Sequence, residues 1–472
     1  MSCGRRSAPL NELRAAIGAE RVSTDPAELI VYAYDGAWAE GRPAVVLHPE
    51  TTRHVAESLR IADRERIPVV PRGAATGLAG GAVAVEGGWC LNLARMNKIL
   101  DISAADSVAV VQPGVVTATL QKEVEKHGLF YPPDPASLHM CTIGGNVSTN
   151  AGGPRCLKYG VTADYVLALE VVLPGGRVMR TGRRTIKDVA GYNLTQLLVG
   201  SEGTLGAITE ITLQLIPKPA AEATALAAFP RIADACEAVG RMLASGIVPL
   251  VTELMDRIVV RAVDAYYQSR SASAGLPLDG DAVLLVAVDG DGEQVERDID
   301  TITALLHGSG ASEVRRARDA VEAEALWEAR RAVSPALIRL AHDRLGEDIV
   351  VPRGHIPRMV ERLRRIAAEH DLTVALFGHI GDGNLHPTIL CDRRDGEMMK
   401  RVQAASGAIF DVTIDLGGSI TGEHGVGIVK LDYLRRAIDP IALEAMQAIK
   451  RIFDPNGVMN PGKKLPSGVG EW

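Results

Sequence analysis

RGAATGLAGGAVA, residues 72–84, is the first of four glycine-rich segments in the N-terminal half of the chain. The others are TIGGNVSTNAGGP (142–154), KYG (158–160) and VGSEGTLGAIT (199–209). Glycine allows main-chain N–H groups to converge on an anion, which is how a loop cradles a pyrophosphate. A single loop of this kind is usually a tight turn. Four of them, beside Pro132-Pro133-Asp134-Pro135, indicate a large cofactor.

The first segment does not match the usual nucleotide-binding motifs. It contains neither GxGxxG nor GxxxxGK followed by Ser or Thr, so neither a Rossmann dinucleotide site nor a P-loop is supported. Residues 42–73 predict strand, helix and strand, a βαβ unit that leads into the loop. VLALEVVLPGGRVMRTG (166–182) predicts a β-hairpin, and GAITEITLQLIPKP (206–219) predicts a strand that prolines end.

Composition narrows the class of protein. A chain of 472 residues exceeds the size of a single core, so at least two domains are expected. The net charge is -7 and no basic stripe is present, which argues against a nucleic-acid partner. The six cysteines lack metal or iron-sulfur spacing and are expected to be reduced. Without a secretory signal or an apolar run of about 18 residues, we expect a cytoplasmic protein that reaches a membrane only through a partner.

The pattern changes after IPKP (216–219): the glycine motifs stop, and long helical patterns alternate with single strands until about residue 375. We therefore expect a first domain over residues 1–219 and a second, of α+β type, over 220–410. The last segment, 411–472, ends in a helix and a Gly/Pro/Asn turn, and we expect it to return to the first domain.

Two short C-terminal motifs carry the groups best suited to metal chemistry. FGHIGDGNLHP (377–387) contains His379 and His386, and GGSITGEHGVG (417–427) contains Glu423 and His424. A strand and a tight turn can direct two imidazoles seven residues apart towards one point, and a carboxylate would complete a divalent-metal site. A lone histidine is more often a core residue, but two flanking GDGN favour ligation. Zinc, manganese or iron(II) suits such a set.

Seven motifs occur in an order that resembles a known family. They are RGAATGLAGG, YPPDPAS, CTIGGNVSTNAGGPRCLKYG, DVAGYNLTQLLVGSEGTLGAIT, GHIGDGNLHP, GGSITGEHGVG and FDPNGVMNPGK. Together they resemble the FAD-linked oxidases of the vanillyl-alcohol oxidase superfamily, in particular the glycolate oxidase FAD subunit and the D-lactate and D-2-hydroxyglutarate dehydrogenases. The resemblance implies an α+β fold: a two-subdomain FAD-binding domain, a cap domain with an antiparallel sheet covered by helices, and a returning tail.

The resemblance also implies which residues bind FAD. Three regions and the tail contribute: Arg72, Gly73, Ala75, Thr76, Gly77, Gly80 and Gly81; Pro133, Ser137, Thr142, Gly144, Gly145, Asn146, Thr149, Gly152 and Gly153; Glu202, Gly203 and Ile208; and Asn460. The family usually has glycine where this chain has Ala75. Members with a covalent flavin often carry a histidine in or near the first loop, and none stands there, so FAD is expected to be non-covalent.

The same resemblance assigns roles in the oxidation of a 2-hydroxy acid. His379, His386 and Glu423 would hold the metal, often zinc, which lowers the pKa of the substrate hydroxyl while flavin N5 accepts the hydride. His424 would be the general base. Arg330, in LWEARRAV (326–333), would clamp the substrate carboxylate, with Arg331 as the neighbouring alternative.

Substrate size and electron acceptor complete the expectation. Some 2-hydroxyglutarate relatives carry Asn and Lys where this chain has Thr388 and Gly346. We therefore expect a small D-2-hydroxy acid, glycolate or D-lactate, with D-2-hydroxyglutarate as the alternative.

Electrons would pass to a quinone, a cytochrome, an electron-transfer flavoprotein or an iron-sulfur partner, and a homo-oligomer is compatible with the sequence. Two alternatives of another class stay open: a metallohydrolase and a non-catalytic flavin-binding subunit.

Overall fold

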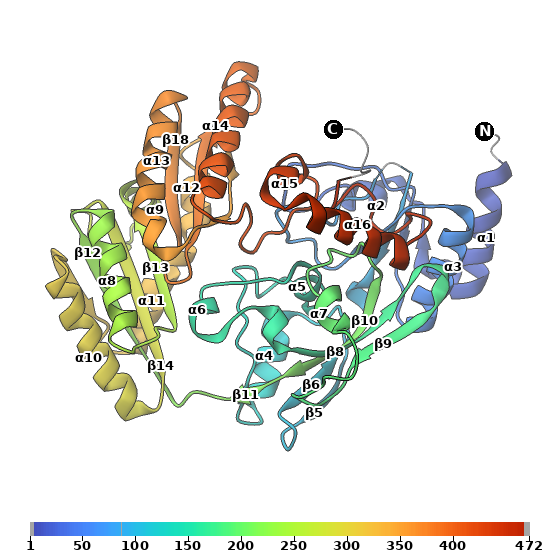
Figure 1. Ribbon diagram of the computed structural model, residues 1–472, viewed down its shortest axis with the longest axis horizontal. Helices are drawn as coiled ribbons and strands as arrows, with labels where there is room; N and C mark the ends of the chain where they lie inside the picture. Colours follow the sequence, from blue (N-terminus) through green and yellow to red (C-terminus); the bar gives the residue numbers. More distant parts are fainter. Residues whose placement is uncertain (1–3, 86, 467–472) are drawn as a thin grey trace. The chain divides into compact units, whose positions relative to one another are not determined.

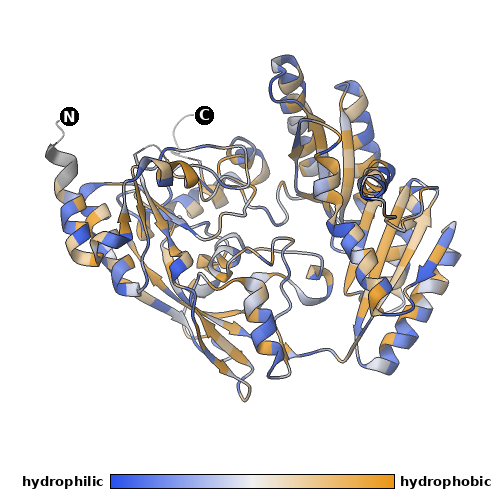
Figure 2. Cartoon of the chain, turned by 180° about the vertical axis from the view of Figure 1, so that it is seen from behind, coloured by the Kyte–Doolittle hydropathy of each residue, from blue (hydrophilic) through white to orange (hydrophobic). Residues whose placement is uncertain are grey.

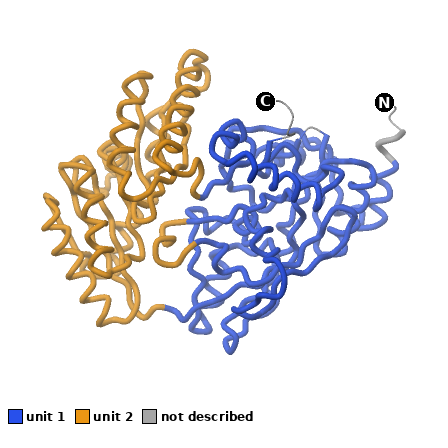
Figure 3. Tube along the Cα trace, viewed as in Figure 1, with its two compact units in different colours: residues 1–152, 161–218, 423–472 blue, residues 153–160, 219–422 orange. Residues whose placement is uncertain are grey.

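The chain folds into two compact units (Figure 3). The computed structural model describes residues 4–85 and 87–466. Unit 1 comprises Met1–Gly152, Val161–Lys218 and Glu423–Trp472, and unit 2 comprises Gly153–Gly160 and Pro219–Gly422. The short segment Gly153–Gly160 thus belongs with the second unit, although the sequence analysis counted it with the first domain.

The first sheet of unit 1 is built on the predicted strand–helix–strand pattern, which is confirmed. Its order is β1 (Val22–Ser23), β2 (Val45–Leu47), β4 (Trp89–Asn92) and β3 (Val69–Arg72), with β2, β4 and β3 parallel. Helix α3 (Thr52–Glu65) joins β2 to β3, and the Thr51 side chain caps it by accepting the His54 N–H. Its apolar positions recur every three to four residues, so Val55, Leu59 and Ala62 pack together with α1 (Gly4–Ile17) in one core.

The second sheet of unit 1 is antiparallel throughout. Its order is β5 (Ile99–Ser103), β6 (Val108–Val111), β10 (Ala207–Gln214), β8 (Val166–Val172) and β9 (Val178–Gly182). The pair β8–β9 is the predicted hairpin. Other elements of this unit are α2 (Pro26–Val31), α4 (Thr117–Glu125), β7 (Leu129–Phe130), α5 (Ile143–Thr149), α7 (Leu194–Leu198) and β11 (Ile216–Pro217).

Helix α5 departs from the glycine-rich loop expected at 142–154. The Thr142 hydroxyl accepts the Gly145 N–H as an N-cap, and Asn150, with φ 53°, ends the helix. A good cap therefore offsets the low helix propensity of two consecutive glycines. Only the ends of this segment remain as loop.

The C-terminal segment of unit 1 adds to the first sheet. After α15 (Leu431–Ala437) and α16 (Pro440–Phe453), coloured red in Figure 1, the chain runs beside β3. The Val69 N–H donates to the Val458 carbonyl (2.7 Å), and the Asn460 N–H donates to the Val69 carbonyl (2.8 Å). Val458 and Met459 are buried in the core that α1 and α3 also form.

Buried polar groups fasten this tail to the first glycine loop. The Glu202 side chain is 3% exposed, and its carboxylate accepts the N–H groups of Val426 (2.9 Å) and Gly427 (2.7 Å). The Asn460 amide donates to the carbonyls of Gly81 (3.0 Å) and Glu202 (2.6 Å). Lys463 donates to the Val83 carbonyl, and burial lowers the pKa of its ammonium to about 8. The loop thus depends on residues far away in the sequence.

Unit 2 is an antiparallel sheet covered by helices, as expected. Its strand order is β15 (Glu313–Arg316), β12 (Ala221–Phe229), β14 (Ala282–Gly290), β13 (Val251–Asp256), β18 (Thr373–His379), β19 (Asn384–Cys391) and β16 (Asp343–Gly346), and β17 (Ile349–Val350) also pairs with β19. Its helices are α6 (Cys156–Tyr159), α8 (Ile232–Ala244), α9 (Arg257–Gln268), α10 (Gly292–Gly308), α11 (Ala320–Arg331), α12 (Val333–Leu337), α13 (Ile356–Glu369) and α14 (Gly396–Asp415).

The helices of unit 2 pack on both faces of the sheet. Helices α9, α11 and α12 share a core with Met255, Val283 and Ala375. Helices α8 and α13 pack on the other face, which bears Leu376. The strands of the sheet are predominantly apolar, whereas the helices carry polar residues on their outer sides (Figure 2). This pattern is typical of a sheet buried between two helical layers.

None of the described helices combines the length and the apolar character needed to cross a bilayer. Cys90, Cys141, Cys156, Cys236 and Cys391 are free thiols, and Cys3 lies outside the described residues.

Ala75 holds the first glycine loop in a conformation that usually calls for glycine. Its φ is 56°, in the left-handed region, whereas no positive φ occurs at the neighbouring Ala74. The left-handed conformation costs an L-residue roughly 1–2 kcal/mol. The loop therefore keeps the backbone path that a glycine at this position would favour.

We expect Ala75→Gly to stabilise the protein by up to about 1 kcal/mol, because relief of this strain exceeds the added flexibility of the unfolded chain. Ala74→Gly is the matched control and should destabilise by about 0.4–1 kcal/mol. Chemical unfolding of both variants measures the difference. Equal effects of the two substitutions would show that Ala75 is not strained.

We expect Glu202→Ala to destabilise the protein by about 3 kcal/mol, because two buried main-chain N–H groups lose their acceptor at roughly 1–3 kcal/mol each. The tail should also become sensitive to protease. Glu125→Ala is the control, since Glu125 only forms an exposed ion pair with Lys218 (2.7 Å) and should contribute less than about 1 kcal/mol. Thermal unfolding and limited proteolysis report both effects, and a Glu202 variant that matches the control contradicts the role.

Candidate functional site

A pocket in unit 1 gathers most of the residues expected to bind FAD. It is lined by the first glycine loop, by the region around α5 and by the turn at Glu202 and Gly203. The expected residues that line it are Arg72, Gly73, Ala75, Thr76, Gly77, Gly81, Ser137, Thr142, Gly144, Gly145, Asn146, Thr149, Gly152, Glu202 and Gly203. Glu423 and His424 line the same pocket.

Five expected residues are not among those that line this pocket. Gly80 faces the Ile428 side chain, the Pro133 carbonyl accepts from a glutamine amide, and Ile208 is buried in β10. Asn460 spans the loop and the turn at residue 202, as described above. Gly153 belongs to unit 2.

The pocket is built from close main-chain approaches. A Cβ atom at Gly73 would lie 2.4 Å from Thr142 Oγ1, and one at Gly144 would lie 2.4 Å from the Pro113 side chain. At Gly77, by contrast, an added Cβ would meet nothing within 4 Å. Side chains are thus excluded where the loops touch, so the main chain itself lines the pocket there. The Gly144 and Gly145 N–H groups donate to the Pro113 carbonyl and to Thr142 Oγ1. This arrangement fits a pyrophosphate, which nests of backbone N–H groups bind.

Two charged side chains in the wall of this pocket hold the first glycine loop in place. The Arg72 guanidinium donates to the carbonyls of Tyr34 (2.7 Å) and Ala82 (3.3 Å), so it closes the two ends of the loop. The Asp35 carboxylate accepts the Ala37 and Ala82 N–H groups, and burial raises its pKa. Sequence reasoning missed Asp35; its only signal was a single acidic residue before Gly36.

In unit 2, the hairpin of β18 and β19 brings the two predicted histidines together. Its register pairs Phe377 with His386 and His379 with Asn384, so all four side chains lie on one face of the sheet. The Nε2 atoms of His379 and His386 are 3.4 Å apart, and the ring centroids are 5.2 Å apart. Both side chains are buried. This is the convergence that the spacing predicted.

Glu253 joins this cluster from the neighbouring strand, and the sequence analysis did not find it. It pairs with His379 in the register of β13 and β18, and it is fully buried. One carboxylate oxygen contacts His379 Nδ1, and the other accepts from Arg330 Nε (2.6 Å) and Nη2 (2.5 Å). Burial alone raises the pKa of Glu253, but Arg330 and His379 outweigh it, so the carboxyl is ionised.

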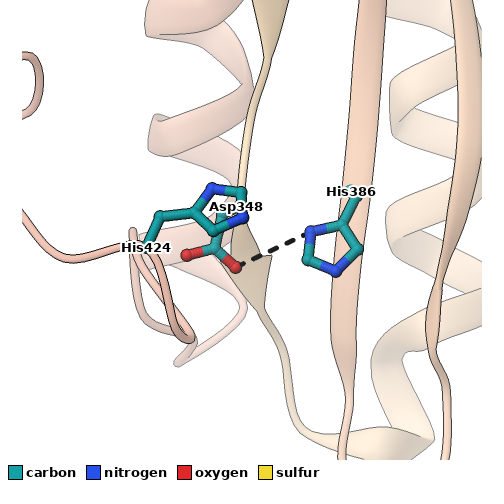
Figure 4. A group of neighbouring side chains, drawn as sticks. All are labelled: Asp348, His386 and His424. Carbon is teal, nitrogen blue, oxygen red and sulfur yellow. Dashed lines mark ion pairs between the residues drawn. The ribbon is translucent and has the colours of Figure 1, made fainter. Parts of the chain in front are cut away.

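Asp348 is the second carboxylate that sequence reasoning missed. It is fully buried, and its Oδ1 faces His386 Nδ1 at 3.9 Å (Figure 4). Oδ1 also accepts from the Asn384 amide (2.8 Å). Oδ2 accepts from the Thr421 hydroxyl (2.8 Å) and from the Gly422 N–H (2.9 Å). Asp348 therefore ties the histidine strand to the end of unit 2.

The remaining predicted residues divide between the units. Arg330 lies in α11 of unit 2, beside Glu253, and its guanidinium carbon is 5.0 Å from the centre of the Phe377 ring. Arg331 pairs with Glu324 at the surface. Glu423 and His424 follow Gly422 directly along the chain and belong to unit 1.

Family comparisons cover both units. The family described as "FAD linked oxidases, C-terminal domain" matches residues 218–464, and the family "FAD binding domain" matches residues 43–182. The chain is 45% identical to the glycolate oxidase subunit GlcD of Bacillus subtilis, over 94% of each protein. It is 39% identical to the glycolate oxidase subunit GlcD of Escherichia coli K12 (98% of this chain, 92% of the relative) and 37% identical to a D-lactate dehydrogenase of Anaerostipes hadrus (90% of each).

Solved structures agree on the fold. p-Cresol methylhydroxylase superposes with a TM-score of 0.83 at 19% identity, covering 100% of this chain and 99% of that one. 4-Ethylphenol oxidase of Gulosibacter chungangensis gives 0.80 at 21% identity, covering 99% and 98%. The resemblance inferred from seven motifs is thus confirmed. The chain belongs to the FAD-linked oxidases, and it is an FAD-dependent oxidoreductase.

Proposed function

We propose that the protein oxidises a small D-2-hydroxy acid, glycolate or D-lactate, to the 2-keto acid with the help of a divalent metal. The observation that carries the proposal is the cluster of Arg330, Glu253 and His379, in which the carboxylate and the imidazole are buried. A 2-hydroxy acid has its carboxylate and its hydroxyl on adjacent carbons. Its recognition therefore needs a cation close to a group that handles the hydroxyl, and one carboxylate separates Arg330 from the imidazole here. Two relatives are glycolate oxidase subunits and another is a D-lactate dehydrogenase, which agrees with this substrate class.

The histidines suit a metal in a specific way. Metal-binding histidines usually direct the second ring nitrogen to a carboxylate, which fixes the tautomer. His379 Nδ1 meets Glu253, His386 Nδ1 faces Asp348, and the two Nε2 atoms approach each other. His379 and His386 would hold the metal through Nε2, with Glu423 as the third ligand. Zinc is the first choice, and manganese or iron(II) suits the same donors.

Each of the protein groups near the substrate would have one role in the reaction. When bound, FAD supplies a hydride acceptor, and the metal supplies the Lewis acidity that makes the hydroxyl more acidic. Arg330 binds the substrate carboxylate, and the partly buried Phe377 ring shields its guanidinium from water on one side. His424 accepts the hydroxyl proton, because a neutral imidazole has one ring nitrogen whose lone pair can accept a proton.

Two uncharged positions favour a monocarboxylate. Gly346 and Thr388 are direct partners in the register of β16 and β19, on the face that also carries His386. Some 2-hydroxyglutarate relatives have Lys and Asn at these positions, which would suit a second carboxylate. The preceding cation on the same face of β16, Arg344, donates to Ser334 of α12 (2.5 Å). D-2-Hydroxyglutarate is thus the less favoured substrate.

We further propose that electrons leave through a partner. Both glycolate oxidase relatives are named as subunits, which favours an iron-sulfur or cytochrome partner chain over a freely diffusing acceptor. A quinone and an electron-transfer flavoprotein are the other acceptors to test.

Anaerobic mixing of the purified holoprotein with glycolate, D-lactate, L-lactate and D-2-hydroxyglutarate tests the reaction. We expect glycolate or D-lactate to bleach the flavin absorbance, and a strong chelator to slow the bleaching. His424→Ala should retain FAD and lose the bleaching. Bound flavin that none of these acids reduces would contradict the proposed substrate class. Bleaching that the chelator does not slow would show that the reaction needs no metal.

Gly346→Lys combined with Thr388→Asn tests the choice of substrate. We expect the double variant to gain tenfold or more in kcat/KM for D-2-hydroxyglutarate, since a charge-assisted hydrogen bond contributes about 1.5–3 kcal/mol. A Cβ atom at Gly346 would lie 3.8 Å from Thr388 Oγ1, which is ordinary van der Waals contact, so the backbone accepts a side chain at this position. Gly346→Met with Thr388→Asn is the control of similar length without the charge. A gain in the control as large as in the lysine variant would rule out the charge effect.

A further inference from the structure

We propose that Glu253 is a positioning residue that couples the metal-holding imidazole of His379 to the substrate-holding guanidinium of Arg330. This inference rests on the function proposed above and adds a group that does not itself touch the substrate. It assigns one carboxylate to two tasks: setting the tautomer of a metal ligand and orienting the carboxylate clamp.

The burial of Glu253 calls for such a role. A carboxylate with no exposed surface is strongly disfavoured unless charged or hydrogen-bonding partners surround it. Met255, two residues along β13 and on the same face, packs in the apolar core with α9 and α11. An apolar side chain at residue 253 would fit this pattern equally well. The charge is therefore explained by its two partners rather than by packing.

On the histidine side, Glu253 fixes which nitrogen is free to bind a cation. Glu253 accepts two hydrogen bonds from the Arg330 guanidinium, so it meets His379 as an acceptor, and the His379 Nδ1 that it contacts carries the proton. The lone pair of His379 is then on Nε2, which faces His386 Nε2 at 3.4 Å. The same contact fixes the ring plane, because the carboxylate comes from the adjacent, register-paired strand.

On the arginine side, Glu253 leaves one end of the guanidinium for the substrate. Glu253 Oε2 occupies the Nε–Nη2 edge, and the Phe377 ring covers the guanidinium carbon at 5.0 Å. Nη1 is the donor that remains directed away from Glu253. The side chain of Arg330 is 14% exposed, so it is held in place and still within reach of a small ligand.

The charge of Glu253 determines how its loss should affect the metal site and Arg330. A divalent cation at His379 and the cation of Arg330 repel each other, and Glu253 is the anion between them. Glutamine at this position has the same shape but presents its NH2 group to one of two partners that both donate. Removing the charge should therefore weaken metal binding and displace the clamp together.

The test uses FAD-loaded protein and Zn²⁺ affinity measured by competition with a chromophoric chelator. We expect Glu253→Gln to weaken Zn²⁺ binding 10–100-fold, the usual effect of losing a carboxylate behind a metal-binding histidine. KM for glycolate should rise as well, whereas Glu253→Asp, which keeps the charge, should restore part of both. Asp256→Asn is the matched control, because Asp256 is a buried carboxylate of the same strand that accepts from Val259 and Leu376 N–H groups; it should lower stability and leave Zn²⁺ affinity unchanged.

A double-mutant cycle separates coupling from simple damage. Arg330→Met should change Zn²⁺ affinity in the native background and have no further effect in the Glu253→Gln background, because Glu253 transmits the change. Additive effects, or a Glu253→Gln protein with native Zn²⁺ affinity and KM, overturn the inference while leaving the proposed function intact. A native protein that binds neither Zn²⁺ nor Mn²⁺ overturns both.

Discussion

Buried carboxylates that accept hydrogen bonds from distant parts of the chain are the interaction on which both units depend. In unit 1, Glu202 accepts two main-chain N–H groups from the C-terminal tail. Since a buried carboxylate without partners is strongly disfavoured, the tail and the glycine-rich segment around Glu202 must form together. In unit 2, Glu253 contacts His379, and Asp348 accepts hydrogen bonds from Asn384, Thr421 and Gly422 while it faces His386. Acidic residues therefore hold the proposed site in place, whereas the glycine-rich loops and the imidazoles are the groups proposed to bind the ligands.

This arrangement explains why loops can carry the pocket. Glycine-rich loops lose much conformational entropy on folding and are not rigid by themselves. Here the first loop is held at Gly81 and Val83 by Asn460 and Lys463, and its ends are closed by Arg72. The main-chain N–H groups are thus held in place before FAD binds, so less ordering is needed on binding.

Local sequence patterns predicted much of the fold, but they did not predict the buried carboxylates that hold the two histidines. Residues 42–73 and 166–182 were predictable because their periodicity and turn residues are local. His379 and His386 were predictable as a pair because a single hairpin joins them. Glu253 lies 126 residues from His379 along the chain, and only the strand register brings the two together. Asp348 escaped notice for the same reason, and the cap at Thr142 shows how one hydroxyl changes a glycine-rich loop into a helix.

Charge balance connects the two carboxylates to the proposed substrate. Glu253 and Arg330 neutralise each other. A divalent cation on His379 and His386 would be matched by Asp348, which faces His386, and by Glu423 as the proposed third ligand. A monocarboxylate substrate therefore adds one negative charge, and Arg330 is the cation that it meets. A dicarboxylate would bring one more negative charge to a face where Gly346 and Thr388 offer no cation, and burial makes an unmatched charge expensive. For hydrolysis, hydroxide on the metal would leave Arg330 with no anion to bind beyond Glu253. A partly exposed guanidinium that Glu253 connects to the two-histidine cluster is more readily explained by a substrate that carries both a carboxylate and a hydroxyl.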